Sequence, residues 1–183
     1  PFSLPLRFFL TAPLFLLAAA ALIVVAPDAL ASRWTPAALA LTHALTLGFL
    51  AMVMVGALTQ MLPVVAGSPL PAPRLVAWMS HVPLALGTVA LMTGFLAAEP
   101  VAFGVAAGLL ATAFLVFLVA ATFSLVRAVA GVTSQGIRLA VTSLGITVAL
   151  GLALVLLRDG WWATPAVEAA VAAHIAFGLL GWV

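Results

Sequence analysis

The chain has 183 residues, of which 67% are hydrophobic and only 5% are charged. A soluble domain carries about a quarter of charged residues, so six basic and four acidic side chains cannot cover a surface that faces water. An intrinsically disordered chain is excluded too, because disorder requires low hydrophobicity and high charge. The composition therefore indicates a protein whose surroundings are the lipid bilayer.

The six basic residues are all arginine, and they are spread along the chain instead of forming a patch that would bind nucleic acid. We expect them to orient the protein in the membrane. The chain has no cysteine, which excludes disulfides, thiolate metal ligands and covalent haem attachment. It has no tyrosine either, so no proton step can use a tyrosine hydroxyl.

Six apolar stretches follow one another, each with about the 20 residues that a membrane-spanning helix needs. They are expected at residues 8–26, 37–65, 75–98, 101–126, 138–157 and 165–183. Because the stretches are continuous and do not alternate with polar residues, they predict helices and not strands. Pro36 and Pro165 each follow a threonine, a pattern typical of a capped first helical turn. We predict an all-α fold: one polytopic transmembrane helix bundle over residues 1–183.

The last apolar stretch stops at Val183 without a loop, a cap or a charge. This ending predicts that the chain is the first half of a longer bundle.

The charged residues between the predicted helices divide into two groups. One side of the membrane receives four arginines and no acid: Arg7, Arg74, Arg127 and Arg138. The other side receives two arginines and three acids: Arg33, Arg158, Asp28, Glu99 and Asp159. The positive-inside rule then predicts a cytoplasmic N-terminus in the inner membrane of a bacterium. Trp34, Trp161 and Trp162 are expected at the outer interface.

Ionisable residues inside a membrane are candidates for function, because burying them without a partner is costly. His43 lies about 10 Å and His174 about 13 Å along their helices from the predicted outer ends, whereas His81 falls in the inner half. His43 and His174 are therefore predicted to serve one site, and both are candidate metal ligands because neutral imidazole is a common ligand of iron and copper.

Each candidate also has a purely structural interpretation. Either His43 or His174 could instead be a histidine bonded to a helix carbonyl, and for His81 we favour that role. Glu168 is expected to interact with the dipole of a helix start, with a proton path or metal site as the alternative. Soft copper ligands are present at Met52, Met54 and Met61, but a methionine stripe more often packs against neighbouring helices.

A haem held by axial histidines would use both the imidazoles and the apolar interior of such a bundle. Gly178 shares the helix face of His174, and a small residue there is expected to leave room for a flat ligand. Arg33 and Arg158, at the outer helix ends, are placed to pair with haem propionates. We therefore assign His43, His174, Arg33, Arg158 and Gly178 to a predicted haem b site.

Two short patterns concern helix arrangement. HALTLG at residues 43–48 weakly echoes HIAFG at residues 174–178, and both begin from the same side of the membrane, as a parallel duplication requires. Gly104 and Gly108 form a small-x-x-x-small pattern, which predicts a close approach between helices.

The segments HALTLGF (43–49) and GALTQMLP (56–63) together resemble the second helix of the haem–copper oxidase subunit I superfamily, most closely its oxidase-like and NnrS-like outliers. HIAFGLLGW (174–182) is similar to another haem-type helix start in such proteins. The resemblance covers mainly residues 37–67 and 168–183. It implies that His43 is an axial ligand of a b-type haem, and it places His174 on the helix that carries a copper ligand in respiratory oxidases.

The chain also departs from that family. The His-Pro-Glu-Val-Tyr type of motif is absent after His174, and no tyrosine is available for a cross-link. These departures count against oxygen reduction with proton pumping more than against haem binding. We predict a haem b protein for electron transfer, or for binding or reduction of O2 or NO, with copper as a further option. The alternatives are a proton-coupled transporter and a structural membrane subunit. Expected partners are lipid, other membrane subunits or a second copy, and an electron-donor protein.

Overall fold

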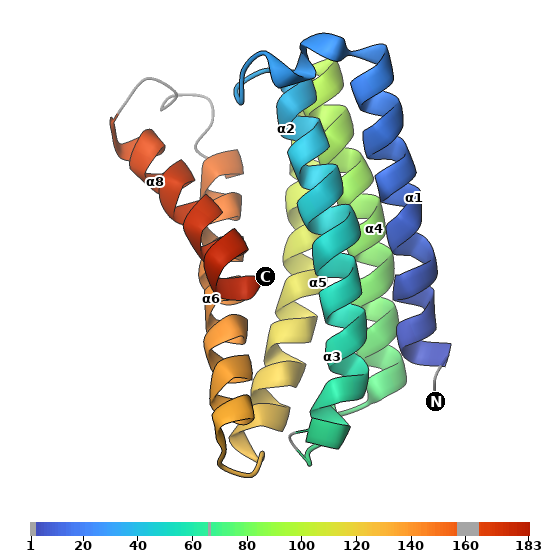
Figure 1. The fold of residues 1–183 in the computed structure, drawn as a ribbon, viewed down its shortest axis with the longest axis vertical. Coiled ribbons are helices and arrows are strands. Elements are labelled where there is room, and N and C mark those ends of the chain that lie inside the picture. Colours follow the sequence, from blue (N-terminus) through green and yellow to red (C-terminus); the bar gives the residue numbers. More distant parts are fainter. Residues whose placement is uncertain (1–2, 66, 157–164) are drawn as a thin grey trace.

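The computed structural model describes residues 3–65, 67–156 and 165–183, without the side chains of residues 28 and 29. Within these ranges every regular element is a helix, so the predicted all-α class is confirmed (Figure 1). Six helical spans are long and apolar enough to cross a membrane. Four spans are single helices: α1 (Ser3–Val25), α4 (Pro73–Ala97), α5 (Pro100–Val126) and α6 (Val132–Leu156).

The other two spans change helix type inside the membrane. The second span consists of α2 (Pro36–His43), the π-helix η2 (Ala44–Ala51) and α3 (Met52–Val65). The last span consists of α8 (Pro165–Ala176) and the π-helix η3 (Phe177–Trp182). A short 3₁₀ helix, η1 (Pro27–Leu30), lies in the connection between α1 and α2. Each π-helix follows one of the two candidate histidines, so the weak echo in the sequence coincides with a shared change of helix type.

Two predicted helix starts were wrong. α1 begins at Ser3 instead of residue 8, and α6 begins at Val132 instead of residue 138. In each case an arginine lies inside the helix, Arg7 in α1 and Arg138 in α6. Arg138 donates a hydrogen bond from Nη2 to the carbonyl oxygen of Leu125, 2.8 Å away, at the end of α5. A long side chain can thus place its charge on a neighbouring helix end while its own backbone stays helical.

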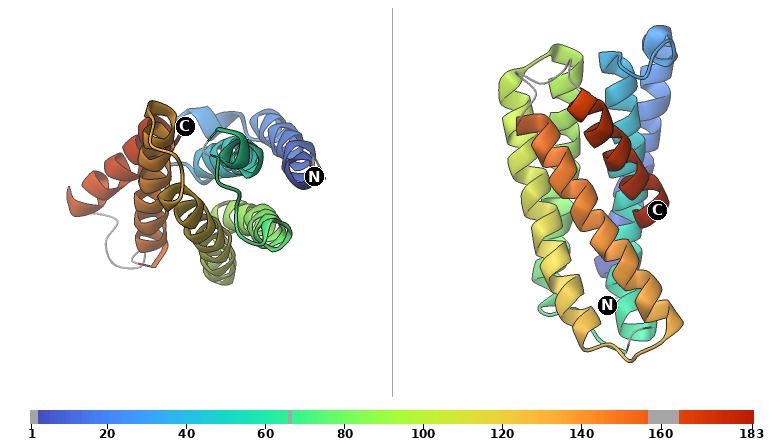
Figure 2. Two further views of the ribbon diagram at one scale, coloured as in Figure 1. Left: turned by 90° about the horizontal axis from the view of Figure 1, so that it is seen from below. Right: turned by 90° about the vertical axis from the view of Figure 1, so that its left-hand side faces the viewer.

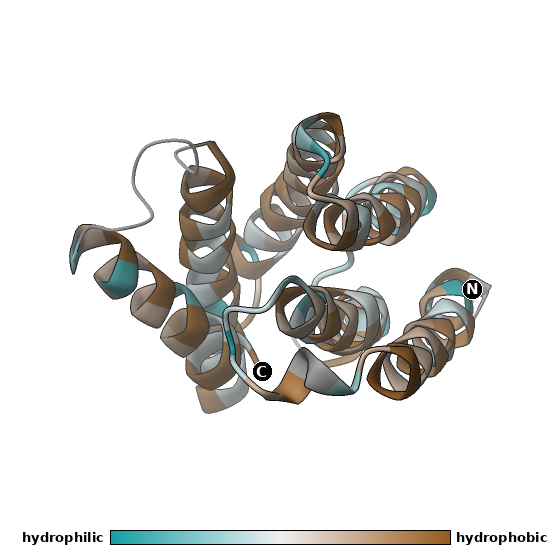
Figure 3. Cartoon of the chain, turned by 90° about the horizontal axis from the view of Figure 1, so that it is seen from above, coloured by the Kyte–Doolittle hydropathy of each residue, from teal (hydrophilic) through white to brown (hydrophobic). Residues whose placement is uncertain are grey.

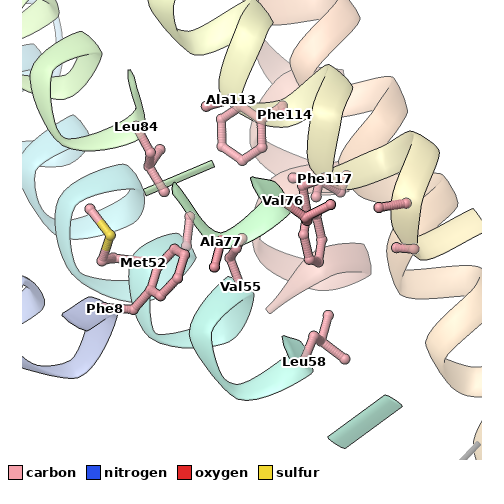
Figure 4. Close-up of a cluster of buried hydrophobic side chains, with 14 of the residues drawn as sticks. Phe8, Met52, Val55, Leu58, Val76, Ala77, Leu84, Ala113, Phe114 and Phe117 are labelled. Atoms are coloured by element: carbon pink, nitrogen blue, oxygen red, sulfur yellow. The ribbon is translucent and has the colours of Figure 1, made fainter. Parts of the chain in front are cut away.

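The main core lies where α1, α3, α4 and α5 meet (Figure 4). Its fully buried side chains include Phe8, Met52, Leu84 and Phe117. Close approach depends on glycines: a Cβ built on Gly48 would lie 2.3 Å from Phe15, and one on Gly56 would lie 2.6 Å from Phe8. The expected close approach at Gly104 and Gly108 is not found within the described chain, where no other residue comes near either position.

α6, α8 and η3 form a pair of spans that contacts the rest of the bundle mainly through α5 (Figures 1 and 2). Trp182 at the end of η3 is buried and meets Phe117 of α5 edge to face, with ring centroids 6.4 Å apart. Only 11% of the apolar window of α6 is buried, against 44% for α5. Many large hydrophobic side chains are exposed, and most of each helix is apolar by hydropathy (Figure 3), which fits contact with lipid.

The charged residues collect at the two ends of the bundle as expected. Arg7, Arg74, Arg127 and Arg138 lie near the end where α1, α4 and α6 begin, and Glu99 and Glu168 lie near the other end (Figure 1). Asp159, Trp161 and Trp162 lie outside the described residues. This division confirms which loops share a side, while the cytoplasmic position of the N-terminus stays a prediction.

Candidate functional site

His43 is the last residue of α2, and the start of that helix fixes its depth. Thr35 caps the helix, because its Oγ1 accepts a hydrogen bond from the backbone nitrogen of Ala38 at 3.1 Å. Pro36 occupies the first turn, where its missing N–H costs nothing. The predicted capping threonine and first-turn proline are therefore confirmed here. For the second such pair, Thr164 lies outside the described residues.

Two contacts fix the ring of His43. Its Nδ1 lies 2.8 Å from the carbonyl oxygen of Leu39, one turn earlier in the same helix. A carbonyl can only accept, so Nδ1 carries the hydrogen, and Nε2 of the neutral ring has its lone pair available. One face of the ring stacks on Phe95 of α4, with centroids 5.3 Å apart and planes 26° apart. Phe103 of α5 in turn meets Phe95 edge to face at 5.1 Å.

The ring of His174 is held by a backbone carbonyl too, but one that belongs to a neighbouring helix. Its Nδ1 lies 2.9 Å from the carbonyl oxygen of Thr147 in α6, so Nδ1 again donates and Nε2 again has a lone pair. Gly151 makes this approach possible, because a Cβ at that position would lie 3.0 Å from the Cε1 of His174. Sequence reasoning missed Gly151. Its only signal was a glycine in the apolar interior of the fifth span.

The two predicted histidines lie within electrostatic reach of each other. They come from α2 and α8, and their imidazoles are close enough that a charge on one would repel a charge on the other. Both side chains are partly buried between helices. Neither Nε2 has a hydrogen-bond partner in the described part of the chain. The site thus presents two imidazole lone pairs inside an apolar bundle. No set of three or more His, Cys, Asp or Glu side chains gathers among the described residues.

The other residues assigned to the site lie differently. A Cβ on Gly178 would lie 3.3 Å from Cγ2 of Thr147, so α6 fills the space that the glycine was expected to leave for a ligand. Arg33 is exposed, and its guanidinium lies 4.7 Å from the ring centroid of Trp34. Arg158 lies outside the described residues, so its predicted pairing with a propionate stays a prediction.

The remaining candidates stand apart from this pair. His81 is on α4 toward the opposite end of the bundle, with its Nε2 2.9 Å from Oγ1 of Thr11. Glu168 is an exposed acid in the first turn of α8. Met52 is fully buried in the main core and Met61 is exposed, and Met54 packs against that core. These positions fit the structural interpretations of the methionines and of Glu168.

Comparison of the chain with protein-family models, with curated proteins and with solved structures found no match. The resemblance to the haem–copper oxidase superfamily therefore stays a prediction that rests on the residues quoted for it.

Proposed function

We propose that this chain is an integral-membrane haem b protein that uses His43 and His174 as axial ligands, for electron transfer or for binding or reduction of O2 or NO. One observation carries the proposal: two histidines from separate helices have Nδ1 bonded to a backbone carbonyl and Nε2 available, close to each other inside an apolar bundle. A histidine that binds a metal typically has its other ring nitrogen donating in this way.

Haem fits this donor set better than a bare metal ion does. A zinc or copper ion takes three or four protein ligands, whereas the described residues supply two histidines together and no third ligating side chain. The haem macrocycle supplies four nitrogens itself, so one or two axial histidines complete the iron. Its flat apolar surface also suits the interior of a helix bundle.

When bound, haem would supply one-electron redox chemistry, and it would bind a diatomic gas only in exchange for one of the two histidines. The chain's own residues have separate tasks. The carbonyl oxygens of Leu39 and Thr147 hold each imidazole in the tautomer that ligates iron. Phe95 holds the plane of the His43 ring, and the surrounding apolar helices exclude water, which tunes the reduction potential.

The two alternative functions have less support. A proton-coupled carrier would need a relay that joins Glu168 to the histidines, and Glu168 forms no hydrogen bond within the described ranges. A purely structural subunit would need only satisfied histidines, whereas each of these two rings has one nitrogen without a partner among the described residues. An oxidase-like architecture, a cytoplasmic N-terminus and an electron-donor partner belong to the same proposal.

The test is the absorption spectrum of the full chain after expression in haem-replete cells. We expect a Soret band that is lost or strongly shifted in His43→Gln and His174→Gln. His81→Gln is the matched control, because it changes the same residue type in the same bundle, and it should keep the band. Circular dichroism would check that helix content is unchanged. A colourless wild-type preparation would contradict the proposal, and proton flux that fails in Glu168→Gln would favour the carrier.

A further inference from the structure

The contact between α1 and α4 holds buried polar atoms that lack partners, far from the His43–His174 pair. Within the described chain, Nε and Nη1 of Arg7 and Nδ1 of His81 are buried without a hydrogen bond. The guanidinium of Arg7 lies 4.1 Å from the ring centroid of Trp78, and Phe8 meets the His81 ring edge to face at 5.0 Å. We call Arg7, Thr11, Trp78 and His81 the α1–α4 polar seam.

Thr11 differs from most threonines of the described chain in its hydrogen-bond partner. Seven threonines donate to the carbonyl four residues earlier: Thr42, Thr46, Thr88, Thr93, Thr112, Thr142 and Thr147. Thr11 instead has the Nε2 of His81 as its partner, at 2.9 Å. A threonine hydroxyl can donate or accept, so this contact holds the ring with either nitrogen protonated. Nδ1 of His81 has no hydrogen-bond partner in the described chain.

The seam thus holds a positive charge whose Nε and Nη1 atoms have no hydrogen-bond partner in the described chain. Arg7 is always charged, and a buried charge without a partner is strongly unfavourable. Carboxylates cannot supply the partner, because the described acids Glu99 and Glu168 lie at the other end of the bundle. Arginine and an imidazole N–H are groups that hold oxyanions through charge-assisted hydrogen bonds.

We propose that the α1–α4 polar seam binds the phosphate group of an anionic phospholipid. Arg7 is four residues into α1 and Trp78 is five residues into α4, so both lie within about 8 Å of the helix ends. Tryptophan favours this interfacial level, where phosphate groups also lie. Arg74, Arg127 and Arg138 at the same end add an attraction for anionic lipid. The site is independent of the proposed haem function.

The first experiment measures lipid retained by the purified full chain, with phosphatidylglycerol or phosphatidylcholine added and native mass spectrometry as the readout. We expect one tightly held phosphatidylglycerol, with affinity reduced roughly tenfold or more in Arg7→Gln. Arg74→Gln is the matched control, because it removes an exposed charge at the same end, and it should change affinity by less than about twofold. Equal losses in both variants, or equal binding of both lipids, would overturn the proposal.

A second measurement uses only the wild-type chain, so it does not depend on whether a variant folds. In the wild-type chain with ¹⁵N-labelled histidine, the ring nitrogen signals of His81 should shift when phosphatidylglycerol is added, while the signals of His43 and His174 stay in place. Inorganic phosphate without lipid tests the other source of the same chemistry. A response to phosphate but not to phosphatidylglycerol would overturn the lipid assignment, and no response of His81 to either would overturn the site.

Discussion

A single backbone carbonyl determines which nitrogen each candidate histidine offers. Considered from sequence, ligation and carbonyl bonding are rival interpretations of His43 and His174. In the structure they are compatible, because the carbonyl takes Nδ1 and leaves Nε2. The sequence indicates the two residues and their common depth. It cannot name Thr147 as the partner of His174, because that contact depends on which helices are neighbours.

Two glycines give a prediction at the scale of single residues, because adding a side chain should have opposite effects on stability at the two positions. Gly48→Ala should destabilise the protein by about 1–3 kcal/mol, since the new Cβ would overlap the Phe15 ring in the core. Gly104→Ala should instead stabilise it by roughly 0.5–1 kcal/mol, because that helix position is open and alanine lowers the entropy of the unfolded chain. Reversible unfolding in mixed detergent micelles measures both, and a destabilised Gly104→Ala would contradict the packing described.

The cap of α2 gives a second residue-scale prediction. Thr35→Ala removes the acceptor for the Ala38 N–H and should reduce the free energy of unfolding by about 1 kcal/mol. Thr93→Val is a suitable control, because Thr93 is an exposed residue whose hydroxyl only bonds the carbonyl one turn earlier. It should change stability by less than about 0.5 kcal/mol. Equal losses of stability in the two variants would show that the Thr35 cap contributes no more than an exposed threonine hydroxyl.

At the scale of elements, the spans were predictable and their internal geometry was not. Continuous apolar runs indicated all six helices. The sequence of Ala44–Ala51, which is ALTLGFLA, contains no pattern that predicts a π-helix. A π-helix has more residues per turn than an α-helix, so the 100° extrapolation from His43 fails beyond Ala44. Residues beyond the π-helix, such as the exposed Met61 and the buried Met52, therefore cannot be assigned to the face of His43 from sequence spacing. Arg7 lies inside α1 and Arg138 inside α6, and both helices begin before the predicted starts at residues 8 and 138.

The π-helix η2 should be required to orient His43 relative to the core. Deleting Thr46 shortens the π segment and turns α2 by roughly 100° relative to α3. We expect nearly unchanged helix content by circular dichroism but loss of the His43–Phe95 stack and of any Soret band. Deleting Val65, at the end of α3, is the matched control, because it leaves the segment between His43 and the core intact. A Thr46 deletion that keeps the haem spectrum would contradict this role.

At the scale of the whole molecule, the candidate site depends on a weakly anchored part of the chain. His43 belongs to the main bundle, whereas His174 belongs to the α6–α8 pair, whose apolar faces are mostly uncovered. Trp182 is the largest buried side chain of the last span, and it meets Phe117 of α5. Its indole N–H has no partner in the described ranges, so the anchor is apolar contact alone. The approach of the two histidines therefore rests on this ring together with the contact of α6 with α5, where Val141 and Leu144 are buried and Arg138 bonds Leu125.

Removing that ring should separate the two halves of the site without unfolding the main bundle. Trp182→Ala deletes the buried contact, whereas Leu180→Ala changes a side chain that is 87% exposed and serves as control. Because the chain has no cysteine, single cysteines at Thr46 and Leu179 can carry spin labels without background. Pulsed electron resonance should give one narrow distance in the wild type and in Leu180→Ala, and a broad distribution in Trp182→Ala. A narrow distance in all three would mean that α6 alone, through the Thr147 carbonyl and Gly151, holds His174 beside His43.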